Sequence, residues 1–181
     1  MKTSLPTWIT FLRIGLLPII VVVFYIDTSW ARPVSCVIFI FAGITDWLDG
    51  YLARLWNVES RFGAFLDPVA DKLMVATILL LIVEFDQSPW LTIPAIVIIG
   101  REIAISALRE WMAEMGQRGK VAVGWLGKVK TTAQITSLAM LLYLHDLFGL
   151  PIYQMGLVAL YIAATLTIWS MVAYMKAAFS N

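Results

Sequence analysis

Long apolar runs separated by short polar breaks dominate the chain from end to end. The runs cover residues 8–26, 33–57, 64–86, 90–115, 127–147 and 151–178. A membrane-spanning helix needs about 20 mostly apolar residues, so each run is long enough to cross a bilayer. The breaks, marked by Gly and Pro, leave too little chain for the strands and loops of a barrel. The pattern predicts an all-α integral membrane protein in which residues 1–181 form a single domain of six transmembrane helices.

Composition supports a membrane protein and removes several kinds of chemistry. Of the 181 residues, 61% are hydrophobic and 14% are charged, whereas soluble domains have about 45–50% apolar and about 25% charged residues. Cys36 and His145 are the only residues of their types, which excludes zinc sites of Cys and His and triads that depend on His. Any metal chemistry must therefore use carboxylates.

Charged residues divide unequally between the two sets of predicted loops. One side carries most of the basic residues, namely Lys2, Arg54, Arg61, Arg118, Lys120, Lys128, Lys130 and Lys176. The opposite loops hold Asp27, Arg32, Glu84, Asp86, His145 and Asp146. The positive-inside rule then predicts that both termini face the cytoplasm. The first run lacks a small-residue cleavage site and contains Arg13, so we expect a retained helix rather than a signal peptide.

Carboxylates and small residues share faces of the second and third predicted helices. On the second, the spacing i, i+3, i+4, i+7 and i+8 aligns Asp46, Asp49, Gly50, Ala53 and Arg54. On the third, the spacing i, i+4 and i+8 aligns Gly63, Asp67 and Asp71. Four aspartates therefore converge from two adjacent helices and require compensating cations. Oxygen ligands alone favour Mg²⁺ or Mn²⁺, and four carboxylates can supply two ions.

Structural alternatives exist for both kinds of residue. Small residues such as Gly50 and Gly63 often serve only to let membrane helices pack closely. The aspartates could form an ion-pair network with Arg54, Arg61 and Lys72. Acids within membrane segments are costly and are usually functional, which favours a ligand site over such a network.

The string Asp46-x2-Asp49-Gly50-x2-Ala53-Arg54-x8-Gly63-x3-Asp67-x3-Asp71 resembles the signature of the CDP-alcohol phosphotransferases. The resemblance implies a six-helix membrane enzyme, usually a homodimer. Such an enzyme cleaves the pyrophosphate of a CDP-linked lipid and passes the phosphatidyl group to an alcohol.

The resemblance also implies roles for individual residues. Asp46, Asp49, Asp67 and Asp71 would bind two metal ions, and Asp71 would also act as the general base. The residues implied to contact the CDP-lipid are Gly50, Ala53, Arg54, Ser60 and Gly63. The stretch from Pro6 to Arg13 resembles the first helix of the family, which implies that Thr7, Thr10 and Arg13 approach the nucleotide.

Basic residues on the fourth and fifth predicted helices bear on the acceptor. Arg101 and Arg109 lie within an apolar segment and need partners, which could be Glu102 and Glu110 or a bound anion. An acceptor that carries its own phosphate would explain a surplus of cations. The candidate phosphate-binding residues are Arg101, Arg109, Arg118, Lys128 and Lys130. Alternatively, Arg118 is an ordinary cytoplasmic loop charge.

Residues 101–110 and 127–134 also resemble the phosphatidylglycerophosphate synthase branch of the same family. That branch implies CDP-diacylglycerol as donor and sn-glycerol 3-phosphate as acceptor, in the bacterial cytoplasmic (inner) membrane with the active site facing the cytoplasm. An inositol-phosphate acceptor is the nearest alternative. The expected partners are these substrates, membrane lipid and a second copy of the chain, with no nucleic acid.

Two classes outside this family also use intramembrane acids. A membrane prenyltransferase binds diphosphate through Mg²⁺ on Asp-rich helices, but Gly50, Ala53, Arg54 and Gly63 argue against one. A divalent-cation transporter would need acids across the bilayer to complete a path, and the aspartates here cluster at one end. A purely structural subunit would leave all four aspartates unexplained.

Overall fold

The computed structural model describes residues 5–56, 61–116 and 125–179, and within these ranges the chain is helical without any strand. The helices are α1 (Leu5–Phe24), α2 (Ala31–Trp56), α3 (Arg61–Asp86), α4 (Pro89–Glu114), α5 (Trp125–Tyr143) and α6 (Ile152–Phe179). Each contains most of one predicted apolar run. The all-α prediction is therefore confirmed for the described part of the chain.

The largest difference from the prediction lies at the end of α5, which stops at Tyr143 rather than near residue 147. Leu144, Phe148 and Gly149 have φ angles of 69°, 53° and 78°, which a right-handed helix does not allow. Leu147 and Leu150 exchange backbone hydrogen bonds of 3.2 and 2.9 Å and close a tight turn. His145 and Asp146, which the sequence placed in a loop, lie in this turn, so the difference concerns only the boundary of α5.

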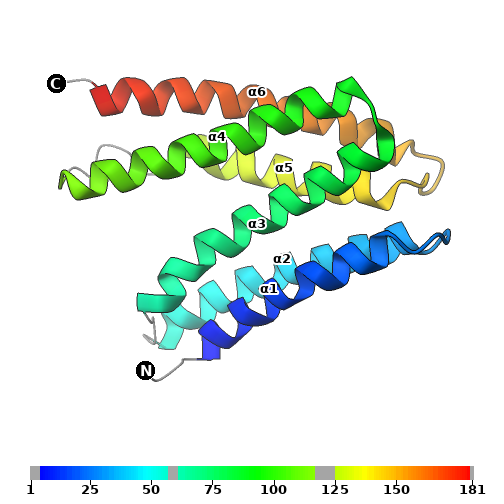
Figure 1. The fold of residues 1–181 in the computed structure, drawn as a ribbon, viewed down its shortest axis with the longest axis horizontal. Helices are drawn as coiled ribbons and strands as arrows, with labels where there is room; N and C mark the ends of the chain where they lie inside the picture. The colour runs from blue at the N-terminus through cyan, green and yellow to red at the C-terminus, as the bar shows by residue number, and fades with distance from the viewer. Residues whose placement is uncertain (1–4, 57–60, 117–124, 180–181) are drawn as a thin grey trace. The chain divides into compact units, whose positions relative to one another are not determined.

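The chain divides into two compact units, which we describe separately. The first comprises residues 1–81 and 142–145, and in it α1 and α2 pack side by side (Figure 1). Ile20, Phe39 and Ile78 are fully or almost fully buried in its core. At the turn between α1 and α2 the guanidinium of Arg32 lies 5.5 Å from the ring centroid of Phe24, so a buried cation there contacts an aromatic face.

The second unit comprises residues 82–141 and 146–181, and in it α4 packs along α6 (Figure 1). Gly156 of α6 is buried against α5: a Cβ at this position would lie 2.9 Å from the Cβ of Met140 and 3.1 Å from the backbone nitrogen of Leu141. Only glycine allows the two helices to approach this closely. Tyr153, near the start of α6, donates a hydrogen bond of 2.8 Å to Asp86.

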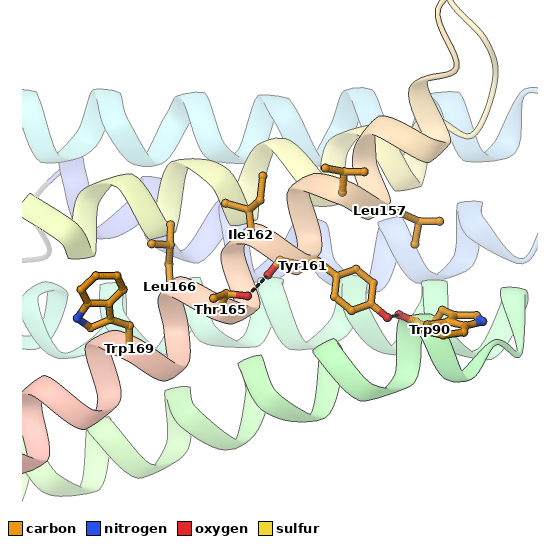
Figure 2. A pocket seen from close by; sticks show the side chains of 8 residues that line it. Trp90, Leu157, Tyr161, Ile162, Thr165, Leu166 and Trp169 are labelled. Atoms are coloured by element: carbon orange, nitrogen blue, oxygen red, sulfur yellow. Dashed lines mark hydrogen bonds between the residues drawn. The ribbon is translucent and has the colours of Figure 1, made fainter.

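A proline inside α4 creates a further link to α6. Pro94 has no N–H group to donate to the carbonyl of Trp90 four residues earlier. The hydroxyl of Tyr161 on α6 donates to that carbonyl at 2.9 Å, as Figure 2 shows. An apolar groove of about 680 Å³ opens beside this contact and is lined mainly by side chains of α6 between Leu157 and Trp169. The carbonyl that proline leaves unpaired thus becomes a helix-to-helix contact.

The surface of the helices is strongly apolar. Val22, Leu80, Ile103 and Trp169 each expose more than 60% of their area, as expected of helices that face hydrocarbon rather than water. Among the described residues, two segments are long and apolar enough to cross a membrane: Pro89–Glu114 and Ile152–Lys176.

Candidate functional site

Arg13 of α1 is the centre of the carboxylate cluster in the first unit. Its side chain is completely buried, and its Nη1 forms ion pairs with Asp46 of α2 and with Asp71 of α3. The contact with Oδ1 of Asp71 measures 2.8 Å. A buried guanidinium requires counter-charges within reach, because it has lost its hydration. One arginine therefore joins three helices.

Thr10 lies one turn before Arg13 and contacts the remaining described aspartate of the cluster. Its hydroxyl donates to Oδ1 of Asp67 at 2.5 Å. Residues i and i+3 on α1 thus face residues i and i+4 on α3, and both pairs follow the side-chain spacing of one helix face. Asp67 and Asp71 thus share one face of α3, as their spacing predicted, and Asp46, Asp67 and Asp71 are gathered around α1, which the spacing did not predict.

The carboxylates are accessible although their cation is not. The side chains of Asp46 and Asp71 are 40% and 54% exposed, against 0% for Arg13. Among the described side chains, no three acidic, histidine or cysteine residues form a complete set of metal ligands. The donors that are described are carboxylate oxygens, the ligands that Mg²⁺ and Mn²⁺ prefer. The donor chemistry therefore fits a hard divalent cation.

Several predicted residues can be placed only on their helices. Gly63 is buried on α3. The backbone at Thr7 belongs to α1 and that at Asp49, Gly50, Ala53 and Arg54 to α2, while their side chains lie outside the described part. Ser60 lies outside the described residues altogether. Because α2 is continuous through Asp46 and Asp49, the helical spacing on which their shared face was predicted is present, and the shared face itself stays a prediction.

A second polar cluster lies in the second unit, around Arg101 of α4. Arg101 donates from Nη1 to Oε1 of Glu102 at 3.0 Å and from Nη2 to the hydroxyl of Ser170 on α6 at 3.1 Å. Lys130 of α5 forms an ion pair with the same oxygen of Glu102. Glu102 therefore joins two cations from two helices, and three helices contribute to the cluster.

Tyr174 of α6 contacts both arginines of α4. Its ring centroid lies 5.7 Å from the guanidinium carbon of Arg101 and 5.4 Å from that of Arg109. Nη2 of Arg109 also donates to the hydroxyl of Tyr174, at 3.4 Å. These distances fall within the range of cation–π contacts. Both arginines that the sequence required to have partners have them, and the shared partner is an aromatic ring.

The cluster retains unused capacity for an anion. Arg101 and Lys130 expose only 8% and 3% of their area. Within the described ranges, the Nε atoms of Arg101 and Arg109 are buried without a hydrogen-bond partner, and such donors are costly unless a ligand accepts from them. Lys128 lies on α5 with its side chain outside the described part, and Arg118 lies outside the described residues. The arrangement suits a multiply charged anion.

The sequence predicted Glu102 as a partner of Arg101, which is confirmed, but it did not lead us to Ser170 or Tyr174. A signal for them exists in α6. Thr167, Ser170 and Tyr174 follow the spacing i, i+3 and i+7 in an otherwise apolar helix, so they share one face. A polar stripe of this kind marks the side of a helix that meets buried charges.

The model of the CDP-alcohol phosphatidyltransferase family matches residues 3–169, a range that contains the carboxylate cluster and most of the arginine cluster. The chain belongs to the CDP-alcohol phosphatidyltransferase family. It is therefore a transferase of phospholipid biosynthesis and a membrane protein. The resemblance that the signature residues indicated is confirmed.

Relatives in this family match nearly the whole chain. A protein of Salmonella choleraesuis (strain SC-B67), described as CDP-diacylglycerol–glycerol-3-phosphate 3-phosphatidyltransferase, is 53% identical over 178 residues, 98% of this chain and 96% of its own length. A protein of Yersinia pestis (strain Pestoides F) with the same description is 53% identical over 181 residues, 100% of this chain and 98% of its own. One of Sodalis glossinidius (strain morsitans), also so described, is 52% identical over 178 residues.

The contacts of Arg13 predict how the protein responds to its replacement. Arg13→Met keeps an unbranched side chain but removes the guanidinium that is the counter-charge of Asp46 and Asp71. Charge-assisted hydrogen bonds to partly exposed acids predict a loss of roughly 1–3 kcal/mol in the free energy of unfolding. Arg13→Lys, which keeps the charge, should lose less. Unfolding of the detergent-solubilised protein measures both.

Leu12→Met provides the matched control, because Leu12 is the neighbouring residue and is 52% exposed. It should unfold like the unmodified protein. If Arg13→Met unfolded no more easily than this control, the ion pairs of Arg13 would not stabilise the first unit.

Proposed function

We propose that this chain transfers the phosphatidyl group of CDP-diacylglycerol to sn-glycerol 3-phosphate, releasing CMP and phosphatidylglycerophosphate. The observation that carries the proposal is the similarity over nearly the whole chain to proteins described by this activity. The arginine cluster supports it independently, because an acceptor with its own phosphate needs a cationic site and serine or choline does not.

The carboxylates form the reaction centre of this proposal. Asp46, Asp49, Asp67 and Asp71 would hold two divalent ions, Mg²⁺ or Mn²⁺, through oxygen ligands. Bound there, the ions would supply positive charge against the pyrophosphate of the donor and the departing CMP. Thr10 and Arg13 keep three of these carboxylates in place from α1.

Asp71 is also the general base. It takes the proton of the acceptor hydroxyl as that oxygen attacks the phosphorus on the lipid side of the pyrophosphate. A phosphorus–oxygen bond forms to the acceptor while the bond to CMP breaks and its electron pair leaves with CMP. Arg13 contacts Oδ1 of Asp71, and the 54% exposure of that side chain gives a substrate access to the carboxylate.

Residues near the carboxylates bind the CDP-lipid. Gly50, Ala53 and Gly63 provide small surfaces that let the nucleotide and its phosphates approach the helices. The polar contacts come from Arg54, Ser60, Thr7, Thr10 and Arg13. Thr10 and Arg13 then have two roles, since their described contacts hold aspartates.

The arginine cluster binds the phosphate of the acceptor. Glu102 is the one acid among the described contacts of Arg101, Arg109 and Lys130, so these three cations exceed the acid that contacts them by two charges. A phosphate monoester carries close to two negative charges at neutral pH. Arg118 and Lys128 supplement this site. The negative charges of an acceptor phosphate would balance this positive excess.

All six helices cross the bacterial cytoplasmic membrane in this proposal, with the termini and both clusters at the cytoplasmic side. The apolar surface of the helices and the asymmetry of the basic residues support the arrangement. A homodimer is the proposed assembly.

The choice of acceptor is the direct test of the activity. Purified protein in detergent with CDP-diacylglycerol and Mg²⁺ should release CMP when sn-glycerol 3-phosphate is added. We expect little release with inositol 1-phosphate, serine or plain glycerol, since only sn-glycerol 3-phosphate carries both the right hydroxyl and a phosphate. Release of CMP and the lipid product are measured in parallel.

Other outcomes would redirect the proposal. Preference for inositol 1-phosphate would move the chain to another acceptor with the same chemistry. An absence of CMP release under all conditions, with transport of divalent cations into vesicles, would contradict the transferase mechanism.

A second prediction concerns the carboxylates and the metal. Excess chelator should abolish turnover, and added Mg²⁺ or Mn²⁺ should restore it. Asp46→Asn, Asp49→Asn and Asp67→Asn should abolish turnover in protein that still folds, because each removes a ligand charge. Asp71→Asn should lose the chemical step but retain binding of CDP-diacylglycerol. Full activity in chelator would contradict the metal mechanism.

The membrane arrangement predicts labelling by a thiol reagent that cannot cross membranes. Cys36 is buried and is the only cysteine, so it contributes little background. In sealed cells whose outer membrane is permeable, Ser29→Cys and Gln87→Cys should react, whereas Glu114→Cys should react only after lysis. Protection of Gln87→Cys in sealed cells would contradict six spans.

A further inference from the structure

Tyr174 contacts both arginines that lie two turns apart on α4. Residues i and i+8 of a helix are separated by about 12 Å along its axis, yet both guanidinium carbons lie within 6 Å of one ring centroid. The ring therefore lies within reach of two like charges and attracts each of them. We propose that Tyr174 is a positioning residue, whose ring holds Arg101 and Arg109 in the geometry that binds the acceptor phosphate.

The ring itself is held by apolar packing. Tyr174 packs with Met171 against a cluster of buried side chains on α4, namely Ile105, Leu108 and Met112. Leu108 directly precedes Arg109, and Ile105 lies one turn after Arg101. The ring is thus anchored on the same helix that carries the two arginines, and α6 fixes both guanidiniums from one side.

The other contacts of the arginines explain why a ring is needed. Arg101 uses one nitrogen for Glu102 and another for Ser170, whose hydroxyl in turn donates to the carbonyl of Thr167 at 2.9 Å. Arg109 makes its described contacts with Tyr174 alone. Arginine has many rotamers, and ordering it costs conformational entropy. For Arg109 the ring is the group that limits this freedom before an anion arrives.

An aromatic face is also a suitable partner for a residue that must still bind a ligand. It attracts a cation without neutralising its charge, whereas a carboxylate such as Glu102 cancels one charge. The buried Nε atoms of both arginines have no hydrogen-bond acceptor among the described residues. The ring orders the arginines and leaves their charge available to a phosphate.

This inference rests on the proposed function, since it concerns the affinity for sn-glycerol 3-phosphate. The test compares Tyr174→Leu, which removes the ring, with Tyr174→Phe, which keeps it. Loss of two cation–π contacts predicts that Tyr174→Leu raises the KM for sn-glycerol 3-phosphate by about 10-fold. Tyr174→Phe should stay within about 3-fold, because the lost hydrogen bond is long. The KM for CDP-diacylglycerol should be unchanged in both.

Tyr161→Leu is the matched control, because it removes a hydrogen-bonded tyrosine from the same helix at a contact with Trp90 rather than with the arginines. It should lower the unfolding temperature without changing the KM for sn-glycerol 3-phosphate. A KM for sn-glycerol 3-phosphate in Tyr174→Leu equal to that of the unmodified protein would overturn the role of Tyr174 alone. The role would also be overturned if Tyr174→Leu and Tyr174→Phe raised the KM for sn-glycerol 3-phosphate equally, or if Tyr174→Leu raised the KM for CDP-diacylglycerol as much as that for sn-glycerol 3-phosphate.

If Tyr174→Leu does not fold, the KM of Tyr174→Phe for sn-glycerol 3-phosphate decides. A rise of more than 10-fold in this KM would overturn the role, and a rise within 3-fold would support it. An unmodified protein that uses no sn-glycerol 3-phosphate would overturn this inference together with the proposed function.

Discussion

The completely buried guanidinium of Arg13 links three helices of the first unit through its ion pairs. A charge without access to water must find its partners on neighbouring helices, and Arg13 finds them on α2 and α3. The same contacts determine where Asp46 and Asp71 stand, and Thr10 extends the effect to Asp67. Contacts from α1 therefore position these three acidic side chains, and the side chains of Asp46 and Asp71 remain partly exposed.

The second unit also buries charged groups that need partners on neighbouring helices, but there the cations outnumber the acid that pairs with them. In the first unit Arg13 pairs with two carboxylates, and in the second the carboxylate of Glu102 pairs with two cations. Each unit has a surplus, negative in one and positive in the other. The first surplus suits metal ions and the second suits a phosphate.

The sequence predicted the elements and spacings that depend on local periodicity. The six predicted apolar runs lie in the six helices of the described residues, and the i and i+4 spacing of Asp67 and Asp71 predicted that they share one helix face. It placed the end of α5 a few residues late, near residue 147 instead of Tyr143, where the backbone of Leu144 turns left-handed. The hydroxyl of Tyr161 that satisfies the carbonyl exposed by Pro94 was not predicted, since it requires the pairing of α4 with α6.

The contacts of the site also divide into local ones, which the sequence predicted, and contacts between distant helices, which it did not. The pairing of Arg101 with Glu102 is local and was predicted from adjacency. Ser170 and Tyr174 come from a helix 69 and 65 residues further along the chain than their respective arginine partners, and helical spacing within α4 cannot identify them. The polar stripe of α6 shows that a partner exists, but only the packing of α4 on α6 shows which one.

The distance along the chain between Arg101 and Ser170 also has a consequence for synthesis. At about 5–20 residues per second, Arg101 leaves the ribosome roughly 3–14 seconds before Ser170. During that interval the arginine is in an apolar segment without its partners on α6. Glu102, made in the next step of elongation, is the counter-charge present from the start. The adjacent acid therefore protects the nascent helix until the last helix of the chain is made.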